Sequence, residues 1–230
     1  MIDISQPFLT NPLEREYESW IVSEIHYYFR KIGIDIEICA VSPSVESSWP
    51  SDEVFLYNGK LIGLQFKQTK LAPKTKSSQY TRLHYDLRQP IGQYQLIQKH
   101  PEIFYVLPTF INRKWKENAL HHCIFWRPDS RLTYYNAWYN NPKAHTNKSY
   151  TNIFSHINSL RWGEFIEQIL SCEIGKKEDK INLSDYVRSI KAELANGNSN
   201  QKSFSNQVEQ TINNQGNLDT LYLLHIPFRK

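Results

Sequence analysis

The feature that most constrains this chain is the segment 51–67, in which two apolar runs are separated by Asn58-Gly59. Asn-Gly between apolar runs is the strongest short-range signal for a β-hairpin, because both residues tolerate the positive φ angles of a two-residue turn. We therefore expect two antiparallel strands joined at Asn58-Gly59. A two-residue turn also fixes the strand register, and this register places Asp52 opposite Gln65.

The open end of this expected hairpin carries three polar side chains. Cross-strand partners, and residues two apart on one strand, point to the same face of a sheet, so Asp52, Gln65 and Lys67 are expected to converge. A carboxylate, an amide oxygen and an ammonium group can together hold a divalent cation and orient a water molecule. The group therefore predicts a metal-dependent phosphodiesterase. The alternative is that Gln65 and Lys67 lie on a solvated sheet face and that Asp52 is a turn residue.

These residues resemble the PD-(D/E)XK nuclease superfamily. Its motif is an acidic residue on one strand, then a turn, then (D/E)-x-K on the next strand, preceded by a helix that often carries a Glu. Here Pro50-Ser51-Asp52 and Gln65-Phe66-Lys67 match it, with Gln65 in place of the usual acid, as in the Mrr-like restriction branch and some phage-defence nuclease domains. The resemblance spans about residues 10–130. It implies an α/β, restriction-endonuclease-like fold with a mixed central sheet flanked by helices.

The resemblance also implies roles for the matching residues. Asp52, the side-chain oxygen of Gln65 and the backbone carbonyl of Phe66 are expected to bind Mg²⁺ or Mn²⁺. Lys67 is expected to position and polarise the attacking water. The implied activity is that of a metal-dependent endonuclease, with DNA favoured over RNA, in a bacterial restriction, phage-defence or mobile-element context. The alternative is a nuclease-fold module that is weakly active or inactive and binds nucleic acid or a protein partner.

Apolar residues at helical spacing predict a helix over 12–32, with Asn11 as N-cap, Glu14 in a capping box and Gly33 at the end. Glu18 and Glu24 flank its apolar side. Either carboxylate can enter a site between helix and sheet, where it would hold the outer water shell of the metal or a second ion, or it can be a solvated helix-face residue. We favour Glu18.

Basic residues follow the predicted site in a segment, 68–82, that shows no periodicity and is expected to be a loop. Lys70, Lys74 and Lys76 are expected to contact backbone phosphates, which gives affinity without sequence reading. The net charge of +4 permits nucleic-acid binding without requiring it.

The rest of the chain alternates strand and helix patterns. We expect a core over 1–175 with a Tyr-, Asn- and Trp-rich loop insertion at about 129–158, followed by a C-terminal region over 176–230 with a helix, a polar linker and a terminal apolar segment. Strands are expected at 34–41, 103–108, 123–126 and 221–226, and helices within 84–100, at 160–172 and at 184–194. Gln93 and Tyr94 resemble the Gln that several families of this superfamily place after the Lys strand, although a polar helix face is the favoured interpretation.

Several other classes of function are disfavoured. Cys39, Cys123 and Cys172 are widely spaced and form no C-x-x-C pair, so neither a zinc site nor a disulfide framework is expected. The N-terminus lacks a signal-peptide pattern, no apolar run is long enough to span a membrane, and no phosphate-binding glycine motif occurs. We therefore expect a cytoplasmic protein. Because no helix-turn-helix or zinc module is recognisable, one alternative is that a partner subunit supplies target recognition, and another is a homodimer.

Overall fold

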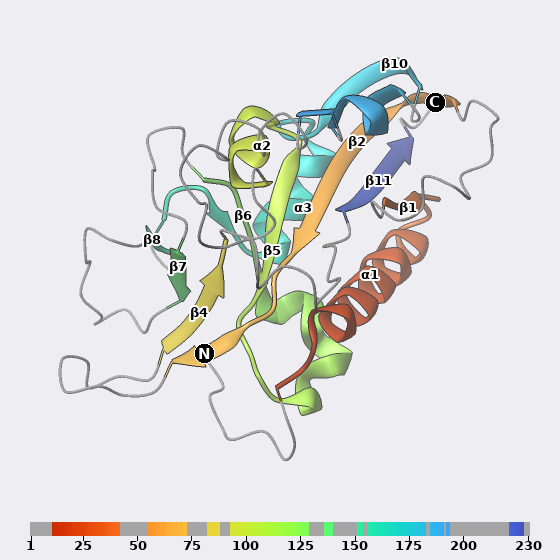
Figure 1. Cartoon of the computed structure of the whole chain (residues 1–230). Helices are drawn as coiled ribbons and strands as arrows, with labels where there is room; N and C mark the ends of the chain where they lie inside the picture. Colours follow the sequence, from red (N-terminus) through yellow and green to blue (C-terminus); the bar gives the residue numbers. More distant parts are fainter. Residues whose placement is uncertain are drawn as a thin grey trace, which may run out of the picture.

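The protein is a mixed α/β structure with a seven-stranded mixed central sheet and helices on both of its faces (Figure 1). This confirms the predicted α/β class with a mixed central sheet flanked by helices. The computed structural model of the chain describes residues 11–41, 55–72, 82–87, 93–128, 136–139, 151–153, 156–182, 185–190, 192–193 and 221–227.

Most of the regular elements belong to the central sheet or pack on it. The helices are α1 (Glu14–Lys31), α2 (Gln93–Lys99), the 3-10 helix η2 (Arg113–His122) and α3 (Trp162–Leu170). The strands are β1 (Glu37–Val41), β2 (Phe55–Phe66), β3 (Lys70–Ala72), β4 (Arg82–Asp86), β5 (Ile103–Pro108), β6 (Cys123–Trp126), β7 (Asn136–Tyr139), β8 (Thr151–Asn152), β9 (Ser159–Leu160), β10 (Lys176–Asn182) and β11 (Leu221–Pro227). Residues 185–190 and 192–193 are also helical.

Helix α1 forms as the apolar spacing predicts, but its N-terminal cap differs from the prediction. The helix begins at Glu14, and the backbone N–H of Leu13 donates to Glu16 Oε2 at 2.8 Å. Glu14 does not serve a capping box with Asn11, because its carboxylate accepts a hydrogen bond from the backbone N–H of Gln68 at 2.9 Å. The start of α1 is thereby held against the chain that leaves β2.

The central sheet is built around β2. Its strand order is β1-β11-β2-β5-β6-β9, and β10 also pairs with β2. Strand β11 is antiparallel to β2 along one edge, whereas β10 (antiparallel) and β5 (parallel) follow each other along the opposite edge. Both described strands of residues 176–230, β10 and β11, therefore belong to the central sheet.

The predicted hairpin at Asn58-Gly59 is wrong, because β2 runs without a break from Phe55 to Phe66. Gly59 is paired with Glu178 on β10 and with Pro227 on β11, and it is not among the residues with positive φ that a two-residue turn requires. A β-carbon at Gly59 would collide with the side chain of His225 and the carbonyl of Ile226. The glycine therefore permits the close approach of β11 and does not form a turn.

The two faces of the central sheet carry separate apolar cores. The α1 face is covered by α1, η2 and α3, and β2 contributes Ile62, Leu64 and Phe66 to it. The α2 face is covered by α2, by residues 185–190 and by β4, and it receives Leu61 from β2. This division follows from the alternation of side chains along a strand.

A second, four-stranded sheet in the order β3-β4-β7-β8 lies beyond the C-terminal end of β2 (Figure 1). The prediction of a loop over 68–82 is therefore wrong at β3, and the predicted helix within 84–100 is confined to α2. Leu83, Tyr85 and Leu87 are all fully buried. Their spacing of two residues is the sequence signal of a strand, but the polar residues around them obscured it. The predicted insertion supplies β7 and β8 to this sheet.

The other predicted elements occur close to their expected positions. The strands at 103–108 and 123–126 have the predicted bounds, and α3 lies within the helix predicted at 160–172. Within the described part of the chain, no helix is long and apolar enough to cross a bilayer.

Candidate functional site

The predicted Q-x-K residues lie at the C-terminal end of β2, between two neighbouring strands. Gln65 is paired with Leu221 of β11 on one side and with Tyr105 of β5 on the other. The backbone N–H of Lys67 donates to the carbonyl of Val106 at 3.2 Å, so the parallel pairing continues past the end of β2. Strand alternation puts the side chains of Gln65 and Lys67 together on the α2 face.

Both side chains are withdrawn from solvent, with exposed fractions of 2% for Gln65 and 4% for Lys67. A polar side chain loses hydration when it is buried, so such burial is tolerated where the group finds partners. Gln65 and Lys67 therefore occupy a desolvated environment, in which charge acts more strongly on a bound group than it does in water.

The structure does not support the predicted pairing of Asp52 with Gln65. That pairing depended on a turn at Asn58-Gly59, and the strand opposite Gln65 is β11, from the far end of the chain. Phe55 and Gln65 are ten residues apart on one strand, which corresponds to about 33 Å. The partners of Gln65 on its two sides are in β11 and β5, so the predicted strand pairing does not place Asp52 beside Gln65. Asp52 itself lies outside the described residues.

Two of the predicted metal ligands, Gln65 and Phe66, lie next to each other. Gln65 Nε2 lies 3.5 Å from the carbonyl oxygen of Phe66, a long contact. A rotation of the amide by half a turn would exchange Nε2 for Oε1 and bring two oxygens together, the ligand type that Mg²⁺ prefers. Both oxygens are neutral, so these donors fit a magnesium ion only if a carboxylate completes the set.

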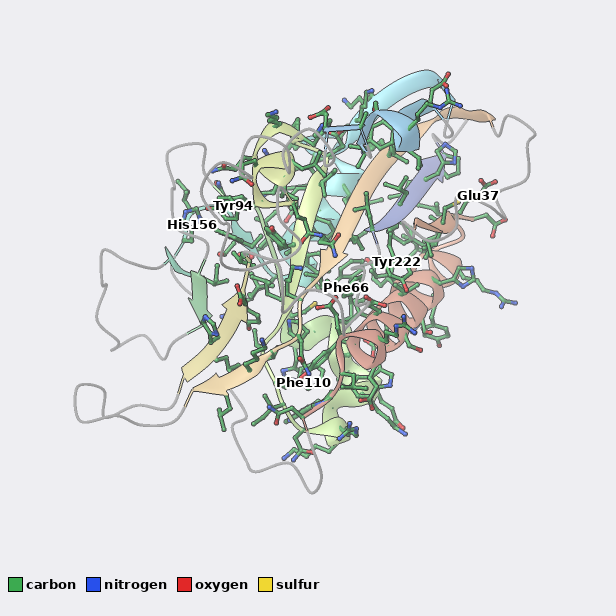
Figure 2. The ribbon with its side chains drawn as sticks, in the orientation of Figure 1. Glu37, Phe66, Tyr94, Phe110, His156 and Tyr222 are labelled. Carbon is green, nitrogen blue, oxygen red and sulfur yellow. The ribbon has the colours of Figure 1, made fainter. Side chains whose placement is uncertain are left out.

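The two helix carboxylates do not reach this face. Glu18 is buried on the α1 face and accepts a hydrogen bond from Tyr222 Oη at 3.2 Å. Figure 2 shows Tyr222 beside Phe66, and their rings meet edge to face with centroids 5.4 Å apart. Because Phe66 points to the α1 face and Gln65 to the α2 face, the sheet separates Glu18 from Gln65.

Glu24 has a structural role. Its two carboxylate oxygens accept hydrogen bonds from the backbone N–H groups of Ala119 and Leu120, each at 3.0 Å. A carboxylate held by two amides of η2 fixes that helix against α1, so the interpretation of Glu24 as a metal-site residue is not supported.

The proximity of Glu18 changes the acidity of Tyr222. Burial of the phenol, followed by the nearby negative charge of Glu18 and the hydrogen bond to it, raises the pKa of Tyr222 to about 12. Tyr222 is therefore a neutral hydrogen-bond donor to Glu18. The sequence did not indicate this contact, because the apolar run at 221–226 predicts a strand but not its partner.

Gln93 lies on the α2 face, at the start of α2. Its side chain is 3% exposed, and its Oε1 atom accepts no hydrogen bond. Next to it in sequence, Tyr94 packs into the core of the α2 face together with Tyr105, the β5 residue paired with Gln65. Figure 2 shows Tyr94 on the side of the sheet away from α1. The interpretation of Gln93 as part of an exposed polar helix face is therefore wrong.

The predicted phosphate-binding lysines are only partly described. Lys70 is exposed on β3, where it is paired with His84, and it lies three residues beyond Lys67. Lys74 and Lys76 lie outside the described residues.

The described residues contain no group of three or more His, Cys, Asp or Glu side chains that could hold a metal ion. Comparisons with protein-family models, with curated proteins and with solved structures gave no match for this chain.

Proposed function

We propose that this protein is a metal-dependent endonuclease and that DNA is its substrate. The observation that carries the proposal is the position of Gln65 and Lys67 on one face of β2, between an antiparallel neighbour, β11, and a parallel neighbour, β5. The chain passes from β2 to β5 through β3, β4 and then α2, and α2 packs on that same face. This arrangement agrees with the strand–helix–strand part of the nuclease core that the Q-x-K motif implies.

In the proposed reaction, Lys67 orients the attacking water and stabilises the negative charge that develops on the phosphate. The oxygens of Gln65 and Phe66, together with a carboxylate, would hold Mg²⁺ or Mn²⁺. A bound divalent cation supplies Lewis-acid stabilisation of the phosphoryl oxygens. Lys70, exposed on β3, is proposed to contact a backbone phosphate together with Lys74 and Lys76.

Cleavage of plasmid DNA, with RNA as a second substrate, tests the proposal with and without Mg²⁺ or Mn²⁺. We expect metal-dependent cleavage that Lys67→Met reduces by about a hundredfold or more, since loss of one transition-state contact has this magnitude. Lys60→Met is the matched control, because Lys60 is also buried on β2 but its ammonium group donates to the carbonyl of Ile169 on the α1 face. Equal cleavage by the natural protein and Lys67→Met would refute the role of Lys67.

The carboxylate of the proposed site must be identified by mutation. Asp52 precedes β2 in the sequence. Asp219 lies two residues before Leu221, and Leu221 is paired with Gln65. Both lie outside the described residues. Loss of cleavage only in Asp52→Asn supports the predicted motif, whereas loss only in Asp219→Asn assigns the acidic residue to the segment that enters β11. Full activity in both variants would exclude a metal site that depends on either residue.

The near-complete burial of Gln65 and Lys67 favours a second candidate function, a module that binds nucleic acid or a protein partner without cleaving it. Fluorescence anisotropy with labelled DNA separates the two. Binding that is independent of divalent metal, without cleavage under any metal condition, supports the binding module. A homodimer, a partner subunit and a role in restriction or phage defence are further proposals that depend on the same assay.

A further inference from the structure

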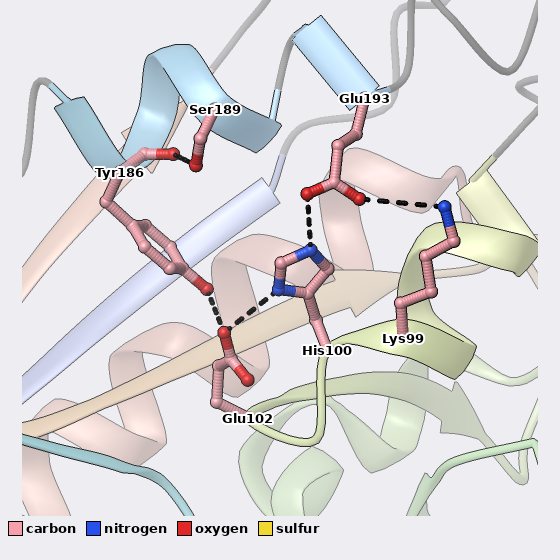
Figure 3. A network of polar contacts seen from close by, with 6 residues as sticks. All are labelled: Lys99, His100, Glu102, Tyr186, Ser189 and Glu193. Carbon is pink, nitrogen blue, oxygen red and sulfur yellow. Dashed lines mark hydrogen bonds and ion pairs between the residues drawn. The ribbon is translucent and has the colours of Figure 1, made fainter.

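A network of polar side chains joins the turn between α2 and β5 to the C-terminal helical residues (Figure 3). His100 directly follows α2, and its two ring nitrogens face two different carboxylates. Nδ1 lies 3.1 Å from Glu102 Oε1, and Nε2 lies 3.1 Å from Glu193 Oε1. Tyr186 Oη donates to the same Glu102 oxygen at 2.6 Å.

The network extends from the interior to the solvent. The side chain of Glu102 is 5% exposed, that of His100 19% and that of Glu193 38%. Its inner end is fixed, because the carbonyl of Glu102 accepts a hydrogen bond from the N–H of Gly63 on β2 at 2.9 Å. At the outer end, Glu193 is the last helical residue described before the chain reaches β11.

The geometry around His100 decides which of its two ring contacts can be hydrogen bonds. A carboxylate can only accept hydrogen bonds, and a neutral imidazole carries a proton on one of its two nitrogens. With a neutral ring, one nitrogen lone pair would face a carboxylate oxygen at 3.1 Å, an acceptor against an acceptor. Both contacts are hydrogen bonds only when His100 is an imidazolium and both carboxylates are ionised.

We infer that His100 is a proton-dependent latch that holds the C-terminal helical residues 185–190 and 192–193 against the α2–β5 turn. With a protonated ring, His100 bridges Glu102 and Glu193 and the latch is closed. When the ring loses its proton, the outer contact to Glu193 is lost, because Glu102 is buried and stays bound to Tyr186. This inference is independent of the proposed nuclease activity.

The other charged groups around the network do not replace the imidazolium. On α2, Lys99 Nζ lies 3.9 Å from Glu193 Oε2, but its side chain is 70% exposed, and exposed ion pairs contribute little. On β10, Lys176 Nζ lies 5.3 Å from the centre of the Tyr186 ring. Arg127, which follows β6, acts on Glu102 only through its charge.

The inner carboxylate remains ionised while the latch operates. Burial by itself raises the pKa of Glu102, but the hydrogen bonds from Tyr186, from its own backbone N–H and from His100 outweigh burial and lower it. The closed latch is therefore expected between the acidic pH at which Glu102 gains a proton and the higher pH at which His100 loses one.

Hydrogen–deuterium exchange of the whole protein between about pH 5.5 and about pH 8.5 tests the latch, with protection corrected for the intrinsic exchange rate. We expect the protection of residues 185–190 to fall by about tenfold as the pH rises, the effect of losing one charge-assisted hydrogen bond, while protection in α1 stays constant. His100→Gln should abolish the pH dependence. The matched control is His26→Gln, at an exposed histidine on α1, which should retain it.

A second variant keeps the inference open to refutation if His100→Gln fails to fold. In Glu193→Gln the amide can donate to a neutral ring, so residues 185–190 should stay protected at high pH. Constant protection of the natural protein across the pH range, or an unchanged pH dependence in Glu193→Gln, would overturn the latch.

Discussion

Two buried lysines have different surroundings: Lys60, in the half of β2 nearer its N-terminal end, and Lys67, just past its C-terminal end. Lys60, 3% exposed, points to the α1 face, where its ammonium group donates to the carbonyl of Ile169 near the C-terminal end of α3. A cation is favourable there because the last carbonyls of a helix lack partners within the helix and carry partial negative charge. Lys67, 4% exposed, accompanies Gln65 on the α2 face.

Burial alone does not identify a catalytic lysine. At the Lys60 end, the partner of the cation is a structural group, and the neighbouring cavity of about 580 Å³ is lined by apolar residues together with Cys172. At the Lys67 end, a second polar side chain, Gln65, shares the face, and the α2 face also buries the unpaired amide oxygen of Gln93. Three buried polar side chains on one face, Gln65, Lys67 and Gln93, make the Lys67 end the candidate site.

The largest effect on stability is expected at Gly59, at the Lys60 end. Gly59→Ala would place a β-carbon against His225 and 2.8 Å from the backbone oxygen of Ile226, so the pairing of β2 with β11 must shift. We expect a loss of about 3 kcal/mol in the free energy of unfolding, measured by urea denaturation.

Gly63, near the other end, is the matched position. A β-carbon there would meet side-chain atoms of Ile103 at 2.9 Å, which can move, so Gly63→Ala should cost about 1 kcal/mol. Gly163→Ala in α3 meets nothing within 4 Å and should be neutral or stabilising. Equal losses at Gly59 and Gly63 would show that the close approach of β11 is not what restricts Gly59.

The next effect concerns the metal requirement at the Lys67 end. A neutral amide oxygen is a weaker ligand for a hard cation than a carboxylate, so Gln65→Glu should lower the Mg²⁺ concentration that cleavage needs. Gln65→Leu removes the oxygen and should reduce cleavage by about tenfold or more, with little change in melting temperature. Titration of the cleavage rate against Mg²⁺ measures both. If Gln65→Leu cleaves as well as the natural protein at every concentration, Gln65 is not a ligand.

A smaller effect is expected for the thiol at the Lys60 end. The hydrogen bond with Lys60 lowers the pKa of Cys172, whereas burial raises the pKa of Cys39 and Cys123. Alkylation by iodoacetamide near neutral pH should therefore be fastest at Cys172, because the thiolate is the reactive form. Lys60→Met should slow that reaction by about threefold to tenfold. Peptide-level mass spectrometry follows each cysteine separately, and a rate at Cys172 that is unchanged in Lys60→Met would contradict the contact.

The smallest effect is expected at an ion pair near the start of α1. Arg113 donates to both carboxylate oxygens of Glu16, at 2.8 and 2.7 Å, and this contact lowers the pKa of Glu16. When folding lowers the pKa of a carboxyl group, the ionised group stabilises the fold at a pH above the pKa of the unfolded state. This stabilisation is lost as the pH falls through the pKa of the folded state. Because both side chains are about one-third exposed, Glu16→Gln should cost less than about 1 kcal/mol at neutral pH and nothing in acid. Thermal melts at the two pH values measure the difference.

Local pattern was sufficient for much of the fold. The strands at 103–108 and 123–126 are continuous apolar runs, α1 shows buried side chains at helical spacing, and these elements form where expected. The prediction failed for segments whose local pattern was overridden by pairing with residues far away in the sequence. Asn58-Gly59 has the composition of a turn, but two strands from the C-terminal region pair with β2 across it.

The sequence by itself determined the α/β class, which side of each helix is buried, and the position of Gln65 and Lys67 at the end of an apolar strand. These properties depend on residues close together in the chain, whose periodicity is local. Only the tertiary structure decided which strand lies beside Gln65, that Glu18 and Gln65 lie on opposite sides of the sheet, and that His100 lies between two carboxylates. These properties depend on pairings between residues as far apart as Gln65 and Leu221, and a local pattern shows that a strand forms but not which strand it meets.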